Sequence, residues 1–165
     1  MLVHPKWRHR ARVVEAASLT LMATAVRRSF AMPSWSRWLG TSKAPKDTFA
    51  AGTDPSCLLP SADPMERSVA LAVRSAAARL PYDPRCLDRA TAGQLMLRRR
   101  AQPGVVVIGL SPNKSEAWGA HAWLVGRRGV ITGGREARDF AAASCFVPAG
   151  ITEPLTLQQA PVPAS

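Results

Sequence analysis

Residues 86–109 read CLDRATAGQLMLRRRAQPGVVVIG, and within this stretch the hydrophobic pattern changes from that of a helix to that of a strand. Apolar residues spread through 86–100 predict a helix, and its last turn consists of three arginines, which suit the negative end of a helix dipole. The β-branched run 105–108 lies between two glycines and predicts a buried strand.

The strand pattern continues toward the C-terminus. Residues 120–125 and 130–132 predict two more strands, joined by a hairpin turn at 126–129. Residues 135–144 are predicted as a short helix, and a proline-rich tail follows. Helices first and an antiparallel meander after them indicate an α+β fold, in which N-terminal helices pack on one face of a small antiparallel sheet.

Toward the N-terminus the pattern predicts two further helices, over 10–30 and 64–80. Asp63 is the expected N-cap of the second, and Pro64 its first residue. Residues 40–63 are rich in Ser, Thr, Pro and Gly and show no helix or strand pattern. We therefore divide the chain into a basic amphipathic helical region (1–40), a linker or loop (41–63), a main domain (64–150) and the proline-rich tail (151–165).

The charge balance favours an acidic partner. The 165 residues include 22 Lys and Arg against 11 Asp and Glu, a formal charge of +11. Nucleic acid, an anionic membrane face or an acidic peptide or protein would all satisfy that charge. Arg and Trp do not alternate on any one element, and no nucleic-acid motif is present, so nucleic acid is not the predicted partner.

The N-terminal helix leaves three uses open. Four basic residues precede the fairly apolar run 13–26, which is too short to span a bilayer. The helix would pack on the domain, lie on a membrane or partner surface, or be cleaved as a signal segment.

The cysteines indicate a reducing compartment. Their odd number and wide spacing do not fit a disulfide framework, which predicts a cytoplasmic protein. The sequence has no CxxC motif, so a structural zinc site is not predicted. Residues 109–115 look like a P-loop but lack the second glycine and one spacer, so no cofactor is predicted.

Cys86 has the surroundings of a reactive thiol. It follows a proline turn and opens the predicted helix, where unpaired N–H groups and the helix dipole stabilise a thiolate. Arg85 adds a neighbouring cation, and such sites lower a thiol pKa by one to several units. A thiolate at neutral pH is a useful nucleophile.

His121 is the predicted proton donor and acceptor for this thiol. His4 and His9 lie in the basic N-terminal arm, whereas His121 lies on the predicted strand 120–125 between two small alanines. A Cys at a helix start that faces a His on a central strand is the papain-like and transglutaminase-like arrangement. A buried structural Cys and a satisfied core His remain the alternative interpretation.

Four blocks of sequence carry a family resemblance: CLDRATAGQLMLRRR (86–100), VVVIG (105–109), WGAHAW (118–123) and GVITGG (129–134). In this order and spacing they resemble the lasso-peptide biosynthesis B2 proteins over roughly residues 65–147. Those proteins are similar to the C-terminal half of the microcin J25 maturation protease and have a transglutaminase-like cysteine-protease fold. The resemblance makes 64–150 the catalytic domain of a cysteine endopeptidase.

The resemblance also implies roles and partners. Cys86 would attack the peptide bond at the end of the leader of a precursor peptide, and His121 would be its base and acid. About 60 residues precede the catalytic part, too few for a built-in leader-binding domain, so we expect a separate leader-recognition protein, the PqqD-like B1 component. A lasso cyclase would take the released core peptide.

One departure from the family pattern concerns the group that orients the histidine. Many members carry an Asp on the strand after the catalytic His, but here the segment reads GVITGG. Glu136 and Asp139 are the candidate orienting acids, and Thr132 or a backbone carbonyl are alternatives. A peptide- or nucleic-acid-binding module, an acyl transferase of the same fold and an inactive scaffold remain the competing functions.

Overall fold

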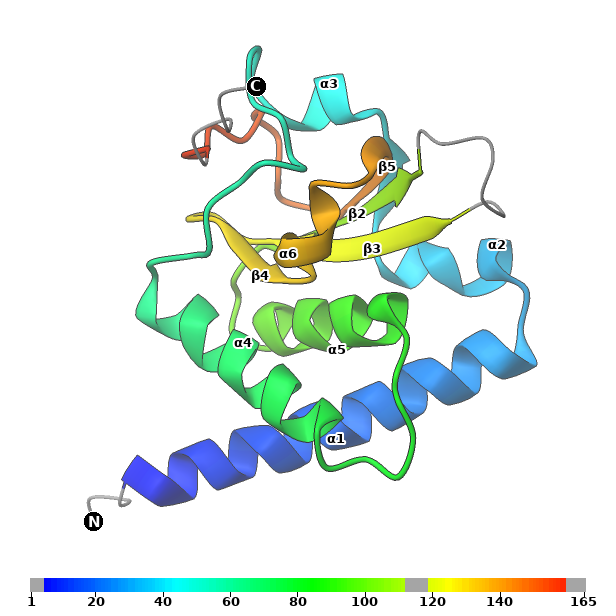
Figure 1. Ribbon diagram of the computed structural model, residues 1–165, viewed down its shortest axis with the longest axis vertical. Coiled ribbons are helices and arrows are strands. Elements are labelled where there is room, and N and C mark those ends of the chain that lie inside the picture. Colours follow the sequence, from blue (N-terminus) through cyan, green and yellow to red (C-terminus); the bar gives the residue numbers. More distant parts are fainter. Residues whose placement is uncertain (1–4, 112–118, 160–165) are drawn as a thin grey trace.

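The computed structural model describes residues 5–111 and 119–159 (Figure 1). His4, Trp118 and most of the P-loop-like segment lie outside these residues. The elements in chain order are α1 (Pro5–Ser29), α2 (Met32–Trp35), a short 3₁₀ helix (Ser36–Trp38), β1 (Thr41–Lys43), α3 (Pro45–Thr48), α4 (Pro64–Ala77), α5 (Cys86–Arg98), β2 (Val105–Leu110), β3 (Ala120–Val125), β4 (Val130–Thr132), α6 (Gly134–Ala137) and β5 (Ala141–Val147).

The fold is α+β, as predicted. The strands form one sheet in the order β1-β5-β2-β3-β4, and every neighbouring pair is antiparallel. Helix α5 lies between the sheet and α1, and α4 packs beside it (Figure 1). The core on this face joins apolar side chains from all three helices to those of the sheet, among them Ala16, Val73, Met96 and Leu124.

Local sequence signals explain where α4 and α5 begin. The Asp63 carboxylate accepts hydrogen bonds from the backbone N–H groups of Met65 (2.8 Å) and Glu66 (3.0 Å), and Pro64 opens the helix. The N-cap prediction is therefore confirmed. Helix α5 begins at Cys86, as predicted, and ends at Arg98, two residues early.

The prediction that residues 40–63 contain no strand or helix is wrong. Residues 41–43 form the edge strand β1, which pairs with β5, and 45–48 form α3. Further along, Phe49 and Leu58 are buried in a second core on the other face of the sheet, where Leu155 and Leu157 of the C-terminal segment also pack. A three-residue strand is too short to show alternation, so only its pairing partner reveals it.

The predicted helix over 135–144 is also wrong beyond its first turn. Helix α6 ends at Ala137, and residues 141–147 form β5 in the interior of the sheet, between β1 and β2. Three consecutive alanines favour a helix locally, but hydrogen bonding to two neighbouring strands outweighs that weak preference.

Helix α1 is longer than predicted and packs on the domain. It begins at Pro5 rather than near Arg10, and Ala16, Thr20 and Ala23 are buried. Trp7 and Val14 are exposed. Within the described ranges, no helix is long and apolar enough to cross a membrane.

Candidate active site

Cys86 is the first residue of α5 and is half-buried. Asp88, two residues further along, anchors this end of the helix to α1. Its carboxylate accepts from Nε of Arg27 at 2.7 Å, from the hydroxyl of Thr24 at 3.0 Å and from the backbone N–H of Arg85 at 3.3 Å. The Cys86 thiol is therefore placed by a helix terminus that two other parts of the chain hold in position.

His121 is the second residue of β3, and its ring is held by packing and by one hydrogen bond. The ring stacks against Trp123 at a centroid distance of 5.9 Å and against Phe140 at 5.2 Å. Its Nε2 atom lies 2.8 Å from the carbonyl oxygen of Gly133. Only 9% of the residue is exposed, so the ring has little freedom to turn.

The structure brings Cys86 and His121 close enough together for each to shift the pKa of the other. Burial raises the pKa of the Cys86 thiol, but hydrogen bonds from His121 and from the backbone N–H groups of Ala122 and Leu87 outweigh burial, and the pKa lies below its ordinary value of 9.0. Burial lowers the pKa of His121, but its hydrogen bonds to Cys86 and Gly133 outweigh burial, and that pKa lies above 6.5. Both shifts favour the thiolate–imidazolium form of the pair over the neutral form.

The Gly133 carbonyl determines which imidazole nitrogen reacts. A carbonyl oxygen only accepts hydrogen bonds, so Nε2 must carry a proton in both charge states of the ring. This leaves Nδ1 as the ring nitrogen that is free to exchange a proton with the Cys86 thiol. This is the task that an Asp or Asn performs in other Cys–His sites.

Neither predicted orienting acid hydrogen-bonds to His121 in the part of the chain that the structure describes. Glu136 lies near enough for its charge to contribute a small increase in the pKa of His121. Asp139 is exposed, and no contact joins it to the ring. Thr132, the other alternative, has a buried hydroxyl with no hydrogen-bond partner among the described residues. The contact to His121 comes instead from a backbone carbonyl.

Gly133 was not among the predicted site residues. Its φ is +73°, and a Cβ there would lie 3.0 Å from Nε2 of His121 and 2.9 Å from the carbonyl oxygen of Ala122. Both facts require glycine at this position. The sequence signal was the Gly-Gly pair where the family pattern has an acid, which marks a tight approach of backbone to the histidine.

Gly133→Ala is expected to slow any reaction of the Cys86–His121 pair by about 10- to 100-fold, because moving the carbonyl releases the ring from its orientation. The pKa of Cys86 should rise in the same variant, since the imidazolium that lowers it is less well held. The pH dependence of Cys86 alkylation by iodoacetamide measures that pKa. Gly52→Ala is the matched control, because Gly52 has φ +82° but open space around it. An unchanged alkylation profile in Gly133→Ala would refute the orienting role.

The other two cysteines have the opposite electrostatics. Burial, with Asp54 nearby, raises the pKa of the Cys57 thiol, and burial raises that of Cys145 to about 11. His9 is exposed on α1, and within the described residues no three His, Cys, Asp or Glu side chains gather as a metal site. The structure thus singles out Cys86.

Iodoacetamide should therefore label Cys86 first. A pKa below 9.0 against one of about 11 implies at least about 100-fold more thiolate on Cys86 than on Cys145 at pH 7. Peptide mapping by mass spectrometry after timed labelling at pH 6 to 10 checks this order. The Cys86 rate should rise with pH and reach half of its maximum at a pH below 9.0. Equal rates for Cys57 and Cys86 would contradict the activated thiolate.

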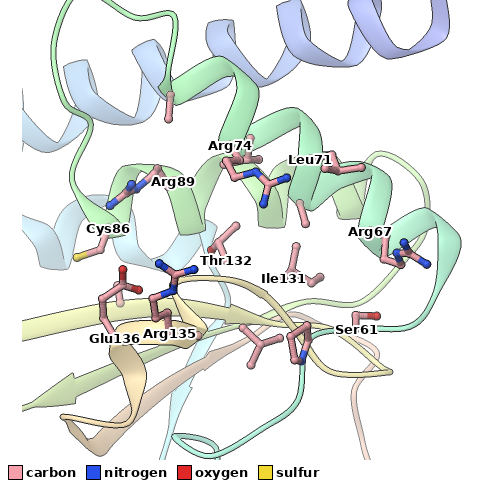
Figure 2. Close-up of a pocket in the computed structure, with 18 of the residues that line it drawn as sticks. Ser61, Arg67, Leu71, Arg74, Cys86, Arg89, Ile131, Thr132, Arg135 and Glu136 are labelled. Carbon is pink, nitrogen blue, oxygen red and sulfur yellow. The ribbon is translucent and has the colours of Figure 1, made fainter. Parts of the chain in front are cut away.

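A groove of about 710 Å³ begins at Cys86 (Figure 2). Helix α4, the start of α5, β4 and α6 form its walls, so the sulfur lies where an extended chain can reach it.

Most of the chain matches one known protein family. A family model described as the transglutaminase-like superfamily matches residues 20–145, a span that includes Cys86, His121, strands β1 to β4 and all but the last two residues of β5. The chain matched no curated protein and no solved structure.

Proposed function

Because the chain belongs to the transglutaminase-like superfamily, we propose that it is a cysteine endopeptidase that cuts the leader from a ribosomally made precursor in lasso-peptide maturation. This superfamily commonly provides cysteine proteases and acyl transferases, and both use the same pair of groups. The observation that carries the proposal is the interacting Cys86–His121 pair, with Cys86 at the end of an open groove.

The pair supports a two-step reaction. The Cys86 thiolate attacks the carbonyl carbon of the scissile bond, and His121 gives its Nδ1 proton to the departing amine as the C–N bond breaks. The product is a thioester on Cys86 and a free N-terminus. His121 then takes a proton from water, the hydroxide displaces the sulfur, and the acid product leaves with the thiolate–imidazolium pair restored.

The substrate and partners rest on the sequence resemblance. The blocks between residues 86 and 134 that resemble the lasso-peptide B2 proteins include both members of the pair and the Gly-Gly segment that approaches His121. We propose that a separate PqqD-like leader-recognition protein presents the precursor, and that a lasso cyclase receives the core.

We place this reaction in the cytoplasm, where three free thiols remain reduced. Exposed Trp7 and Val14 on α1 support contact between this helix and the inner membrane face. Co-sedimentation with anionic vesicles, compared with Trp7→Ala, tests that contact. Equal recovery of both proteins in the supernatant would exclude it.

The test combines the purified protein with a precursor peptide and its leader-recognition protein, and follows the products by mass spectrometry. Cys86→Ala serves as the blank. Wild-type protein should yield leader and core separated at one bond. Added hydroxylamine should convert part of the leader into its hydroxamate, which reports the thioester.

Each other outcome has a distinct meaning. Cleavage that persists in Cys86→Ala would refute the proposed nucleophile. A leader joined to an added amine, with no hydrolysis in water alone, would assign the chain to acyl transfer. Absence of cleavage when the partner is shown to bind would favour a non-catalytic scaffold.

A further inference from the structure

The groove beside Cys86 is lined by four arginines. Arg67 and Arg74 lie on α4, Arg89 lies on α5, and Arg135 lies on α6. Figure 2 shows Arg135 and Arg89 near Cys86, whereas Arg67 lies at the far end of the groove. Among the described residues, none of the four guanidinium groups forms an ion pair with a carboxylate.

The acidic residues of the groove do not neutralise these arginines. Asp83 and Glu136 are the only carboxylates among the lining residues, against four arginines. Glu136 lies beside Cys86 (Figure 2). The far part of the groove, between Arg74 and Arg67, is therefore the more positive part, and the end at Cys86 is closer to neutral.

Apolar and hydrogen-bonding surface lies between the arginines. Leu71 lies between Arg67 and Arg74 on α4 and is 43% exposed, although it is a large apolar side chain. Ile131 and Thr132 of β4 also line the groove, and the buried Thr132 hydroxyl has no hydrogen-bond partner in the described part of the chain. A polypeptide offers both the apolar side chains and the backbone groups that such a surface needs.

We infer that this groove binds an acidic segment of the substrate peptide in extended conformation, with carboxylates at Arg67 and Arg74 and an apolar side chain on Leu71. The inference rests on the proposed function and specifies its substrate class. Because Glu136 repels a carboxylate near Cys86, the acidic residues lie away from the scissile bond.

The spacing of the arginines sets the spacing of the acids. Arg67 and Arg74 are seven residues apart on α4, a rise of about 10.5 Å along the helix axis. An extended chain covers that distance in about three residues. Two acidic residues about three positions apart therefore match the pair.

A peptide fits this groove better than a nucleic acid does. Proteins that bind single strands place aromatic side chains under the bases, and no Trp, Tyr or Phe is among the lining residues. The attacking thiolate also acts on an acyl carbon, which a peptide supplies and a nucleotide backbone does not.

The experiment measures binding apart from cleavage. Full-length Cys86→Ala protein is titrated against a fluorescein-labelled dodecapeptide with Glu at every third position and Leu between. The matched peptide has Gln at those positions, and fluorescence anisotropy reports both. The Glu peptide should bind at least about tenfold more tightly at low salt, and this advantage should shrink between 0.01 and 0.1 M salt, as the screening length falls from about 30 to about 10 Å.

Charge-reversal variants locate the site. Arg67→Glu with Arg74→Glu should remove the preference for the Glu peptide, whereas Arg8→Glu with Arg10→Glu, exposed on α1 outside the groove, should retain it. Circular dichroism melting verifies that both double variants fold. If the first pair does not fold, Arg67→Gln with Arg74→Gln replaces it, with a partial loss expected.

Three results would overturn the inference: equal binding of the Glu and Gln peptides, equal loss in both charge-reversal pairs, or tighter binding of oligouridylate that the Arg67 and Arg74 changes abolish. The last result would reassign the groove to nucleic acid. Peptide binding is measured on Cys86→Ala protein, so it can be interpreted even if the wild type does not cleave the leader. Likewise, a failure to bind the Glu peptide does not affect the outcome of the cleavage test.

Discussion

Cys86→Ala and His121→Ala are each expected to lower kcat for leader cleavage by at least about 10⁴-fold, because residues that act as one catalytic unit fail together. Cys86→Ala removes the atom that forms the thioester. His121→Ala leaves that atom but removes the group that ionises it and protonates the leaving amine. Single-turnover cleavage followed by mass spectrometry measures both losses.

The pH dependence of iodoacetamide labelling gives a second measurement for His121→Ala, which still has the Cys86 thiol. In the wild-type protein the hydrogen bond from His121 lowers the pKa of Cys86 against the opposing effect of burial. Without His121, burial and the remaining backbone N–H groups set the pKa, so the pH at which iodoacetamide labels Cys86 at half its maximal rate should rise. This shift separates loss of ionisation from loss of fold.

His9→Ala is the matched control, because His9 is exposed on α1 and has no part in the pair. It should retain both the cleavage rate and the labelling profile of the wild type. A His121→Ala variant that folds and labels Cys86 with an unshifted profile would contradict the ion pair.

Asp88→Ala is expected to lower the free energy of unfolding by about 3 kcal/mol, because it leaves the largely buried Arg27 guanidinium without its carboxylate partner. The Asp88 side chain is 1% exposed and that of Arg27 is 23% exposed, and Nε of Arg27 lies 2.7 Å from the carboxylate. The Thr24 hydroxyl and the Arg85 backbone N–H lose the same acceptor. Urea denaturation followed by circular dichroism measures the loss.

A double change isolates the unpaired charge. Asp88→Leu with Arg27→Met removes both charges and should recover most of the lost stability. Glu153→Ala, an exposed carboxylate on the C-terminal segment, should change the unfolding free energy by less than about 0.5 kcal/mol. A loss below about 1 kcal/mol in Asp88→Ala would show that the pair does not anchor α5.

Some elements were predictable because their signals are local. The N-cap at Asp63, the start of α5 at Cys86 and the strands 120–125 and 130–132 depend on residues within a few positions of one another. The strands β1 and β5 were not predictable in this way. β5 has a helix-favouring alanine run, and its pairing partners on β1 and β2 lie about 100 and 35 residues earlier in the chain.

The sequence by itself determined which side chains are the candidates for the chemistry: Cys86 has a helix start and a proline turn next to it, and His121 lies between alanines on a strand. Only the tertiary structure decided what orients the histidine and what lines the groove. The Gly133 carbonyl contacts Nε2 of His121 because β4 ends beside β3. Every residue has a carbonyl, so the amino-acid sequence cannot identify the one that orients the ring. Likewise, +11 is a property of the chain, but the gathering of Arg67, Arg74, Arg89 and Arg135 around one groove depends on three helices that only packing brings together.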